Sequence, residues 1–157
     1  MSGDPVGFIG LTTLDIDPNC GADIEWDLER HPYPFADNDF DEVHAYHILE
    51  HLGRQGDWRG FLADFAELWR ILKPNGRLIG LSPHGAWEWG DPGHTRLVSR
   101  ESLTFLSQRE YDEQVGKTPM TDYRHFYRAD FDPIVVQDAE DQLAFILAAV
   151  KPSRISI

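Results

Sequence analysis

Cysteine is nearly absent from this sequence. Cys20 is the only one in 157 residues, so an intramolecular disulfide is excluded. Cys20 lies in a stretch of loop-forming residues, and its setting does not indicate a nucleophile. A chain without disulfides is typical of a reducing compartment. No basic segment followed by an apolar run opens the sequence, so a signal peptide is not expected. These absences predict a cytoplasmic protein.

Basic residues and long apolar runs are also scarce. The chain has 14 Lys and Arg against 27 Asp and Glu, which gives a formal net charge of -13 at pH 7. Such a surface repels phosphate backbones, so avid nucleic-acid binding is not expected. The longest apolar stretch, residues 143–150, is far too short to span a bilayer, so no membrane partner is expected. Hydrophobic residues still make up 41% of the chain. That content and the length predict one compact domain over residues 1–157.

Short apolar runs alternate with helical patterns along the first half of the chain. Apolar residues recur at steps of three and four after Asp57, which predicts a capped helix over residues 58–72. A short helical turn is expected over residues 47–52, before Gly53. The segment Lys73-Pro74-Asn75-Gly76 is expected to stop the long helix. Strands are predicted over residues 8–16, 22–26, 40–46 and 77–81.

The second half begins with a loop over residues 84–98 that is rich in Gly, Trp, His and Pro. Helices are expected near residues 101–106, capped by Ser99 or Ser102, and near 109–115. Two apolar runs, 131–137 and 142–150, predict a terminal β-hairpin. Strands separated by helices indicate an α/β fold with a mostly parallel sheet. In such sheets ligands bind beyond the carboxyl ends of the strands.

Three segments occur in an order that is informative. Residues 34–44 read PFADNDFDEVH, residues 45–52 read AYHILEHL, and residues 61–83 read FLADFAELWRILKPNGRLIGLSP. This succession resembles the class I S-adenosylmethionine-dependent methyltransferases, in particular the type 11-like enzymes that act on small molecules. The resemblance covers residues 8–83. It implies a truncated Rossmann-like methyltransferase sheet with flanking helices and a C-terminal antiparallel β-hairpin.

The resemblance implies S-adenosylmethionine as the cofactor. In this family, an acidic residue after the second strand of the sheet accepts hydrogen bonds from both ribose hydroxyls of the cofactor, because a carboxylate can accept two hydrogen bonds. Asp15 and Asp17 stand at that place, although beside Pro18 they equally suit turn formation. The acidic residue after the next strand accepts a hydrogen bond from the adenine amino group. The implied cofactor-binding residues are Asp15, Asp17, Asp27, Leu28, Tyr46 and His47.

The methyl acceptor, a small molecule or a protein, is expected to meet the loops after the strands at residues 40–46 and 77–81. An imidazole there can remove a proton from an acceptor oxygen or nitrogen, and aromatic rings can stack on a flat substrate. The alternative is that these histidine and aromatic residues are ordinary polar and bulky loop residues with no role toward an acceptor. The expected catalytic residues are His47, His51 and His94. The expected substrate-binding residues are Glu50, Trp87, Trp89, Asp91 and Arg96.

One family feature is missing from the 157 residues. No glycine-rich loop precedes Phe8, although glycines there normally let the backbone approach the methionine part of the cofactor. Either the remaining contacts or a partner subunit hold the cofactor, or cofactor binding is lost. The second case predicts an inactive methyltransferase-like protein that binds or inhibits a protein partner. Loss of a central strand also exposes a sheet edge, which predicts a homodimer.

A third function is suggested by a short motif. His47, Glu50 and His51 match the zinc-hydrolase pattern H-x-x-E-H, in which the two histidines share a metal from one helix face. The match is weak, because Gly53 and Gly56 end the segment at once and the methyltransferase pattern contains the same LEH letters. No resident metal is expected on this basis.

Overall fold

A computed structural model describes residues 10–155 of the chain. Within it the chain forms two compact units, Met1–Pro34 and Phe35–Ile157. The predicted strand at residues 8–16 begins outside the described residues. The expectation of a single domain stays a prediction, and each unit is considered by itself below.

The first unit contains two short parallel strands, β1 (Leu14–Asp15) and β2 (Ile24–Glu25). Both are shorter than predicted, because the predicted strand ends are turns. The Asp23 carboxylate accepts hydrogen bonds from the backbone nitrogen and the hydroxyl of Thr13, at 2.7 and 2.8 Å. These bonds favour the charged form and lower the pKa of Asp23. Side-chain bonds therefore supplement a ladder of only two residues.

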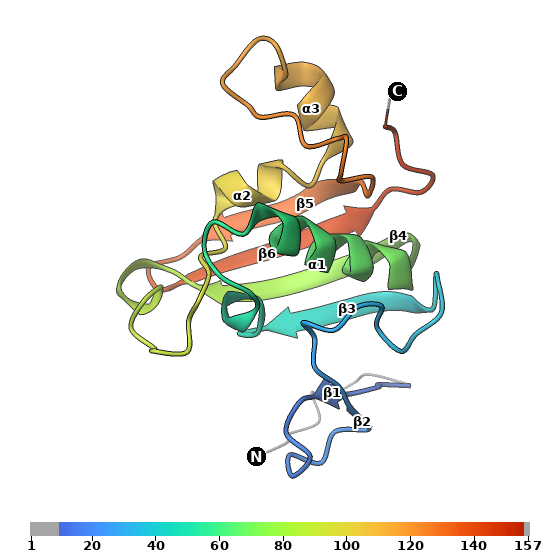
Figure 1. The fold of residues 1–157 in the computed structure, drawn as a ribbon, viewed down its shortest axis with the longest axis vertical. Coiled ribbons are helices and arrows are strands. Elements are labelled where there is room, and N and C mark those ends of the chain that lie inside the picture. Colours follow the sequence, from blue (N-terminus) through green and yellow to red (C-terminus); the bar gives the residue numbers. More distant parts are fainter. Residues whose placement is uncertain (1–9, 156–157) are drawn as a thin grey trace. The chain divides into compact units, whose positions relative to one another are not determined.

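The second unit is built on a four-stranded sheet in the order β3-β4-β6-β5 (Figure 1). The pairing of β3 with β4 is parallel, whereas β4–β6 and β5–β6 are antiparallel. The expected C-terminal hairpin is confirmed, but the expectation of a mostly parallel sheet is wrong for these strands, since two of their three pairings are antiparallel. The strands are β3 (Phe40–Tyr46), β4 (Leu72–Pro83), β5 (Phe131–Asp138) and β6 (Gln142–Ala149).

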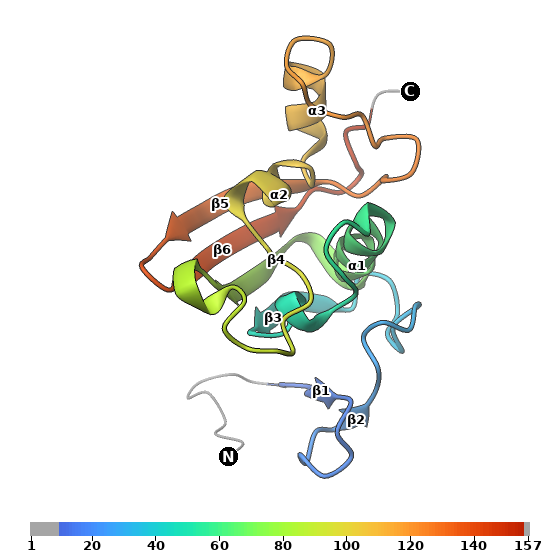
Figure 2. The ribbon, with the colours of Figure 1, turned by 60° about the vertical axis from the view of Figure 1, so that its left-hand side comes forward.

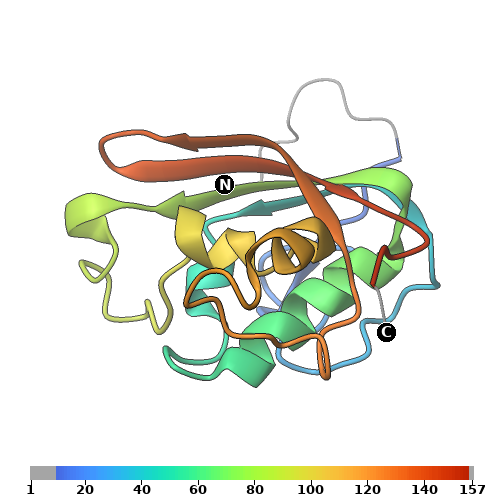
Figure 3. The same cartoon turned by 90° about the horizontal axis from the view of Figure 1, so that it is seen from above.

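Helices cover one face of this sheet. α1 (Trp58–Ile71), α2 (Arg100–Thr104) and α3 (Gln108–Gln114) all lie on the same side of it in Figure 3. The predicted cap of α1 is confirmed, because the Asp57 side chain accepts from the Gly60 nitrogen at 3.0 Å. Ser99 and Ser102 together form a capping box at α2. Local hydrogen bonds encoded in the sequence thus set where both helices begin.

The start of β4 differs from the prediction. The segment Lys73-Pro74-Asn75-Gly76 does end α1, but β4 already begins at Leu72, opposite Phe40 of β3. The parallel register then shifts between Phe40 and Glu42, and Asn75 has a φ of 63°. The turn residues are therefore an irregularity within the strand and do not precede it.

The core lies between the sheet and its helices. Along β6 the buried residues Leu143, Phe145, Leu147 and Ala149 alternate with half-buried ones, as expected for a strand with one covered face. Phe65 of α1 is buried on this side. No described helix has the length and apolar character needed to cross a membrane.

Candidate functional site

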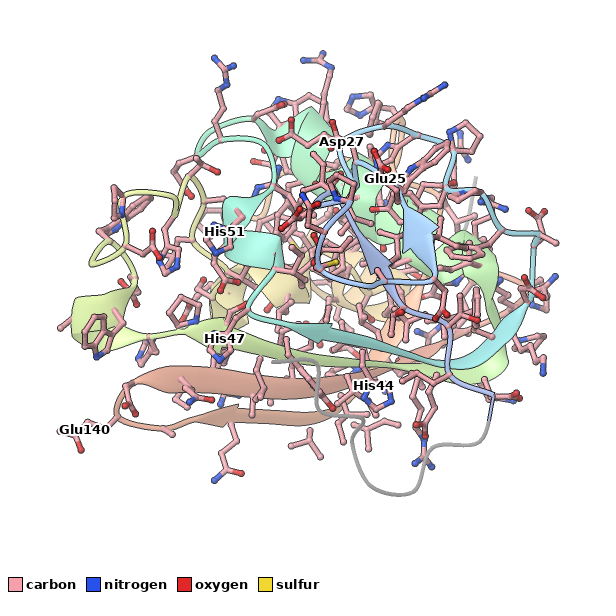
Figure 4. All side chains as sticks on the ribbon, turned by 90° about the horizontal axis from the view of Figure 1, so that it is seen from below. Glu25, Asp27, His44, His47, His51 and Glu140 are labelled. Carbon is pink, nitrogen blue, oxygen red and sulfur yellow. The ribbon has the colours of Figure 1, made fainter. Side chains whose placement is uncertain are left out.

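The candidate site lies at the carboxyl ends of β3 and β4, where parallel strands meet at one edge of the sheet. Beyond β3 the chain forms a short 3₁₀ turn, η1 (Leu49–His51), which confirms the predicted helical turn in a shorter form. Beyond β4 it enters a long loop that contains η2 (Gly85–Trp87) and returns toward α2 (Figure 2). Figure 4 shows His47 just past β3 and His51 on η1.

Backbone hydrogen bonds tie the long loop to η1. The nitrogens of Thr95 and Arg96 both donate to the Glu50 carbonyl, at 2.9 and 3.1 Å. The loop thereby places the ring of His94 against that of His51, with centroids 4.8 Å apart. Glu50, His51 and His94 each offer a ligand atom, and these atoms lie within 4.8 Å of one another. Residues 43 positions apart in sequence therefore form one cluster.

The Glu50 carboxylate is 1% exposed and poorly satisfied. Its Oε2 accepts from the Ser82 hydroxyl at a long 3.4 Å. Its Oε1 has no hydrogen-bond partner among the described residues, and His47 Nδ1 lies 3.5 Å away. His47 itself is about half exposed and adopts a left-handed φ of 52°, so it turns away from a helical path.

The two clustered histidines have defined tautomers. His51 Nδ1 lies 3.0 Å from the Gly93 carbonyl, and His94 Nδ1 lies 3.0 Å from the Trp87 carbonyl and 3.1 Å from that of Glu88. Carbonyl oxygens only accept, so each Nδ1 must carry the proton. In the neutral form of either ring, Nε2 is then the nitrogen without a proton, which can accept a proton or coordinate an ion.

Arg96 belongs to the long loop, and its side chain is buried. Its Nη1 donates to Asp64 Oδ2 at 2.7 Å, and both side chains are less than a tenth exposed. A side chain at Gly53 would collide with Arg96 Nη2, so glycine lets the two segments approach. The ion pair anchors the loop to α1. Arg96 Nε and Nη2 have no hydrogen-bond partner among residues 10–155. A role of Arg96 toward an acceptor stays a prediction.

The other predicted loop residues are exposed. The Trp87 and Trp89 side chains are 61% and 55% exposed. Asp91 accepts from the Gly93 nitrogen at 2.7 Å, which shapes the turn before His94. The predicted contacts of Trp87, Trp89 and Asp91 with an acceptor stay predictions.

At the end of β3, Tyr46 and His44 share one side of the strand, as their spacing predicts. His44 Nδ1 lies 2.6 Å from the Tyr46 hydroxyl, and its Nε2 lies 3.1 Å from Glu42. Burial raises the pKa of Tyr46, and the charge of Glu42 raises it further. Tyr46 is therefore a neutral hydrogen-bonding group at neutral pH.

The acidic residues predicted to hold the cofactor all belong to the first unit. Asp15 accepts from the Asp17 nitrogen, and Asp17 accepts from the backbone and side-chain nitrogens of Asn19. Asp27 accepts from the Glu29 nitrogen, and Leu28 is half-buried in the same turn. These bonds support the turn-forming interpretation. Each of these bonds uses the Oδ1 atom of its aspartate. The predicted cofactor roles, which could use the other oxygen, remain compatible with them.

A pocket of about 220 Å³ lies beside the N-terminus of α1. Sequence reasoning missed most of its wall, including the stack of Trp58 on Tyr123 with ring centroids 4.6 Å apart. It also missed Asp64. An acidic residue between Phe61 and Phe65 on an apolar helix face was the available signal for a buried ion pair. The wall includes Trp58, Phe61, Arg96, Phe105 and Tyr123.

Comparison with known proteins agrees with the sequence interpretation. Residues 14–80 match the sequence model of a family described as a methyltransferase domain. A solved SAM-dependent methyltransferase from Archaeoglobus fulgidus has 15% identity and a TM-score of 0.51, with 86% of this chain and 74% of that chain covered. No curated protein matches the sequence.

Two further solved structures are similar at lower TM-scores. A SAM-dependent methyltransferase from Methanosarcina mazei has 15% identity and a TM-score of 0.46, covering 83% of this chain and 69% of that chain. The N-methyltransferase NodS from Bradyrhizobium japonicum has 15% identity and a TM-score of 0.47, covering 89% and 73%.

The predicted resemblance is thereby confirmed for the segment that suggested it, and S-adenosylmethionine is the cofactor that the match and the fold imply. The chain has the Rossmann-like fold of the class I S-adenosylmethionine-dependent methyltransferases, and its residues 14–80 match the sequence model of a methyltransferase domain.

Proposed function

We propose that the protein is an S-adenosylmethionine-dependent methyltransferase that acts on a small-molecule or protein acceptor. The observation that carries this proposal is the match of residues 14–80 to a methyltransferase domain. The described sheet supports it, since its strands have the fold of a known methyltransferase.

The donor groups present suit part of the cofactor. Exposed carboxylates follow β1 and β2, and carboxylates accept strong hydrogen bonds from ribose hydroxyls and an adenine amino group. Asp15 and Asp17 would hold the ribose, and Asp27, with Leu28 packed nearby, would hold the adenine. Tyr46 and His47 would contact the remainder. When bound, the cofactor supplies an activated methyl group.

The second unit contributes groups for the acceptor. In the neutral form, His51 and His94 with Nδ1–H bonded to carbonyl oxygens have Nε2 as the proton-accepting nitrogen, which suits removal of a proton from an acceptor oxygen or nitrogen. His47 is the third base, and Glu50, Trp87, Trp89 and Asp91 complete the acceptor contacts. Arg96 lines the pocket beside α1, and its Nε and Nη2 atoms have no hydrogen-bond partner among the described residues. That supports a contact with an anionic or carbonyl group of the acceptor.

One observation favours a second candidate function. The carboxylates of Asp15, Asp17 and Asp27, which would bind the cofactor, already accept the hydrogen bonds of local turns. A methyltransferase-like protein that has lost cofactor binding and binds a protein partner would have the same features.

Thermal unfolding with added S-adenosylmethionine or S-adenosylhomocysteine separates the two candidates. A ligand that binds only the native state at 100 times its Kd adds about 2.7 kcal/mol of stability. For a chain of this size each kcal/mol raises the Tm by about 2–4 °C. A methyltransferase is expected to shift by several degrees. No shift at millimolar ligand would support the binding protein and reject the enzyme.

A further inference from the structure

We propose that Glu50, His51 and His94 form a binding site for a divalent transition-metal ion, with Zn²⁺ as its first candidate. The site would hold the ion with two imidazole nitrogens and one carboxylate oxygen. This inference does not rest on the proposed methyl transfer; with the ion bound, His51 and His94 would be ligands, and the proposed role of proton acceptor would belong to His47 alone.

The spacing of the three ligand atoms suits one ion. They lie within 4.8 Å of one another in the structure without metal. Zn²⁺ binds His and Glu ligands at about 2.0–2.2 Å, so two of its tetrahedral ligands are about 3.5 Å apart. The rings of His51 and His94 are already in contact, and small rotations of the three side chains would bring their ligand atoms to that spacing.

The buried carboxylate of Glu50 is the independent observation. It is 1% exposed, and Oε1 has no hydrogen-bond partner among the described residues. Burying an ionised carboxylate costs several kcal/mol unless it is paired or coordinates a metal. The His47 nitrogen at 3.5 Å and the Ser82 hydroxyl at 3.4 Å are long contacts that satisfy it poorly. A cation bound by the Glu50 carboxylate would compensate its buried charge.

The histidines are oriented as metal ligands usually are. Metal-binding histidines donate their second ring N–H to a carbonyl or carboxylate, which fixes the ring and leaves the other nitrogen for the ion. Both His51 and His94 donate Nδ1–H to backbone carbonyls of the long loop, which directs the choice of ligand to Nε2. The loop therefore provides both a ligand and the groups that orient both rings.

The ligand set differs from the one that the H-x-x-E-H motif suggests. That motif needs His47 and His51 on one helix face, but His47 has a φ of 52° and η1 spans only three residues. His94 takes the place expected of His47, and Glu50 becomes a ligand. Three protein ligands leave a coordination position of Zn²⁺ open for water or for an oxygen or nitrogen ligand.

Calorimetric titration of the metal-stripped full chain with Zn²⁺, followed by Co²⁺ substitution, tests the site. We expect one ion per chain and visible Co²⁺ absorption typical of a low-coordinate site with nitrogen ligands. Glu50→Gln keeps the side-chain shape and is expected to weaken binding at least about tenfold. His94→Ala is expected to do the same, and His125→Ala is the matched control that should bind as the parent chain does.

A stability readout guards against misfolding. Zn²⁺ should raise the Tm of the parent chain and of His125→Ala, but not that of Glu50→Gln. Far-UV circular dichroism checks that each variant is folded before titration. Lack of saturable Zn²⁺ or Co²⁺ binding by the folded parent would overturn the proposal, as would unchanged affinity in a folded Glu50→Gln chain. Because no methyl donor is added, these outcomes are independent of the proposed enzyme activity.

Discussion

Asp64 and Arg96 form the most deeply buried ion pair of the candidate site, with the two side chains 7% and 3% exposed. Asp64→Asn removes the negative charge and leaves Arg96 buried without a counter-ion. Loss of one partner of a buried pair typically costs about 3–5 kcal/mol of unfolding free energy. We expect a loss of this size in chemical denaturation.

The control for that variant is Asp41→Asn. Asp41 pairs with Lys73 at the same 2.7 Å, but its side chain is 81% exposed. Exposed ion pairs contribute about 0–1 kcal/mol, so little change is expected. Equal effects of the two substitutions would show that burial does not set the strength of the Asp64–Arg96 pair.

Asp122 gives the chain a defined acid sensitivity. Hydrogen bonds from the Arg124 side chain lower the pKa of Asp122 from its ordinary value of 3.8 to about 2. Because the folded pKa is the lower one, its contribution to stability is present above pH 3.8 and is lost as the pH falls through 2. The side chain is 39% exposed, so screening makes the effect small.

Asp122→Asn should therefore reduce the difference in stability between pH 4.5 and pH 2. The two denaturation curves of the variant should lie closer together than those of the parent chain. An unchanged difference would contradict the role of the pair with Arg124.

Some contacts of individual residues in the candidate site could be predicted from the sequence, and others could not. His51, Glu50 and His94 were selected from their places near strand ends, and the structure brings them together. The buried partner of Arg96 was not found, because contact between residues 32 positions apart depends on how the loop returns to α1. Likewise, the tautomers of the histidines depend on carbonyls of Trp87 and Gly93, which no side-chain pattern reveals.

At the scale of elements, β4 contains a glycine that its neighbour requires. A Cβ at Gly80 would lie 2.0 Å from the ring of Phe145, its antiparallel partner on β6, and Phe145 is 1% exposed. Gly80→Ala should destabilise the chain by about 1–3 kcal/mol through overpacking. Denaturant unfolding measures this loss.

Replacing the Phe145 ring with a smaller side chain should relieve the clash. In the background of Phe145→Leu the added methyl of Gly80→Ala has more room, so its cost should fall, and the double-mutant cycle should show coupling. Additive effects of the two substitutions would contradict a direct clash.

Local signals predicted the elements that have strong local causes. α1 follows from its cap at Asp57 and its apolar periodicity, and β3 has the bounds that were predicted, residues 40–46. By contrast, β1 and β2 are only two residues each, since the Asp and Pro turns beside them take the neighbouring backbone. The start of β4 at Leu72 depends on pairing with Phe40, which is a tertiary effect that overrides the turn residues.

At the scale of the whole molecule, the sheet of the second unit ends in the outer strands β3 and β5. Among the described strands β3 is an outer one, with β4 as its neighbour in the sheet, and outer strands are common sites of association between chains. We expect the chain to form a homodimer. Size-exclusion chromatography with light scattering at micromolar concentration should give about twice the chain mass of 18.0 kDa. A monomer mass throughout that range would contradict this expectation.

Calorimetric titration of the full chain with S-adenosylhomocysteine measures cofactor binding without turnover. We expect saturable one-to-one binding. We also expect at least about tenfold weaker binding by Asp17→Asn, which keeps an acceptor for Asn19 but loses a charge-assisted bond to the ribose. Glu140→Ala, at the turn between β5 and β6, should bind as the parent chain does (Figure 4). Absence of binding at millimolar ligand would show that the protein is not an S-adenosylmethionine-dependent enzyme.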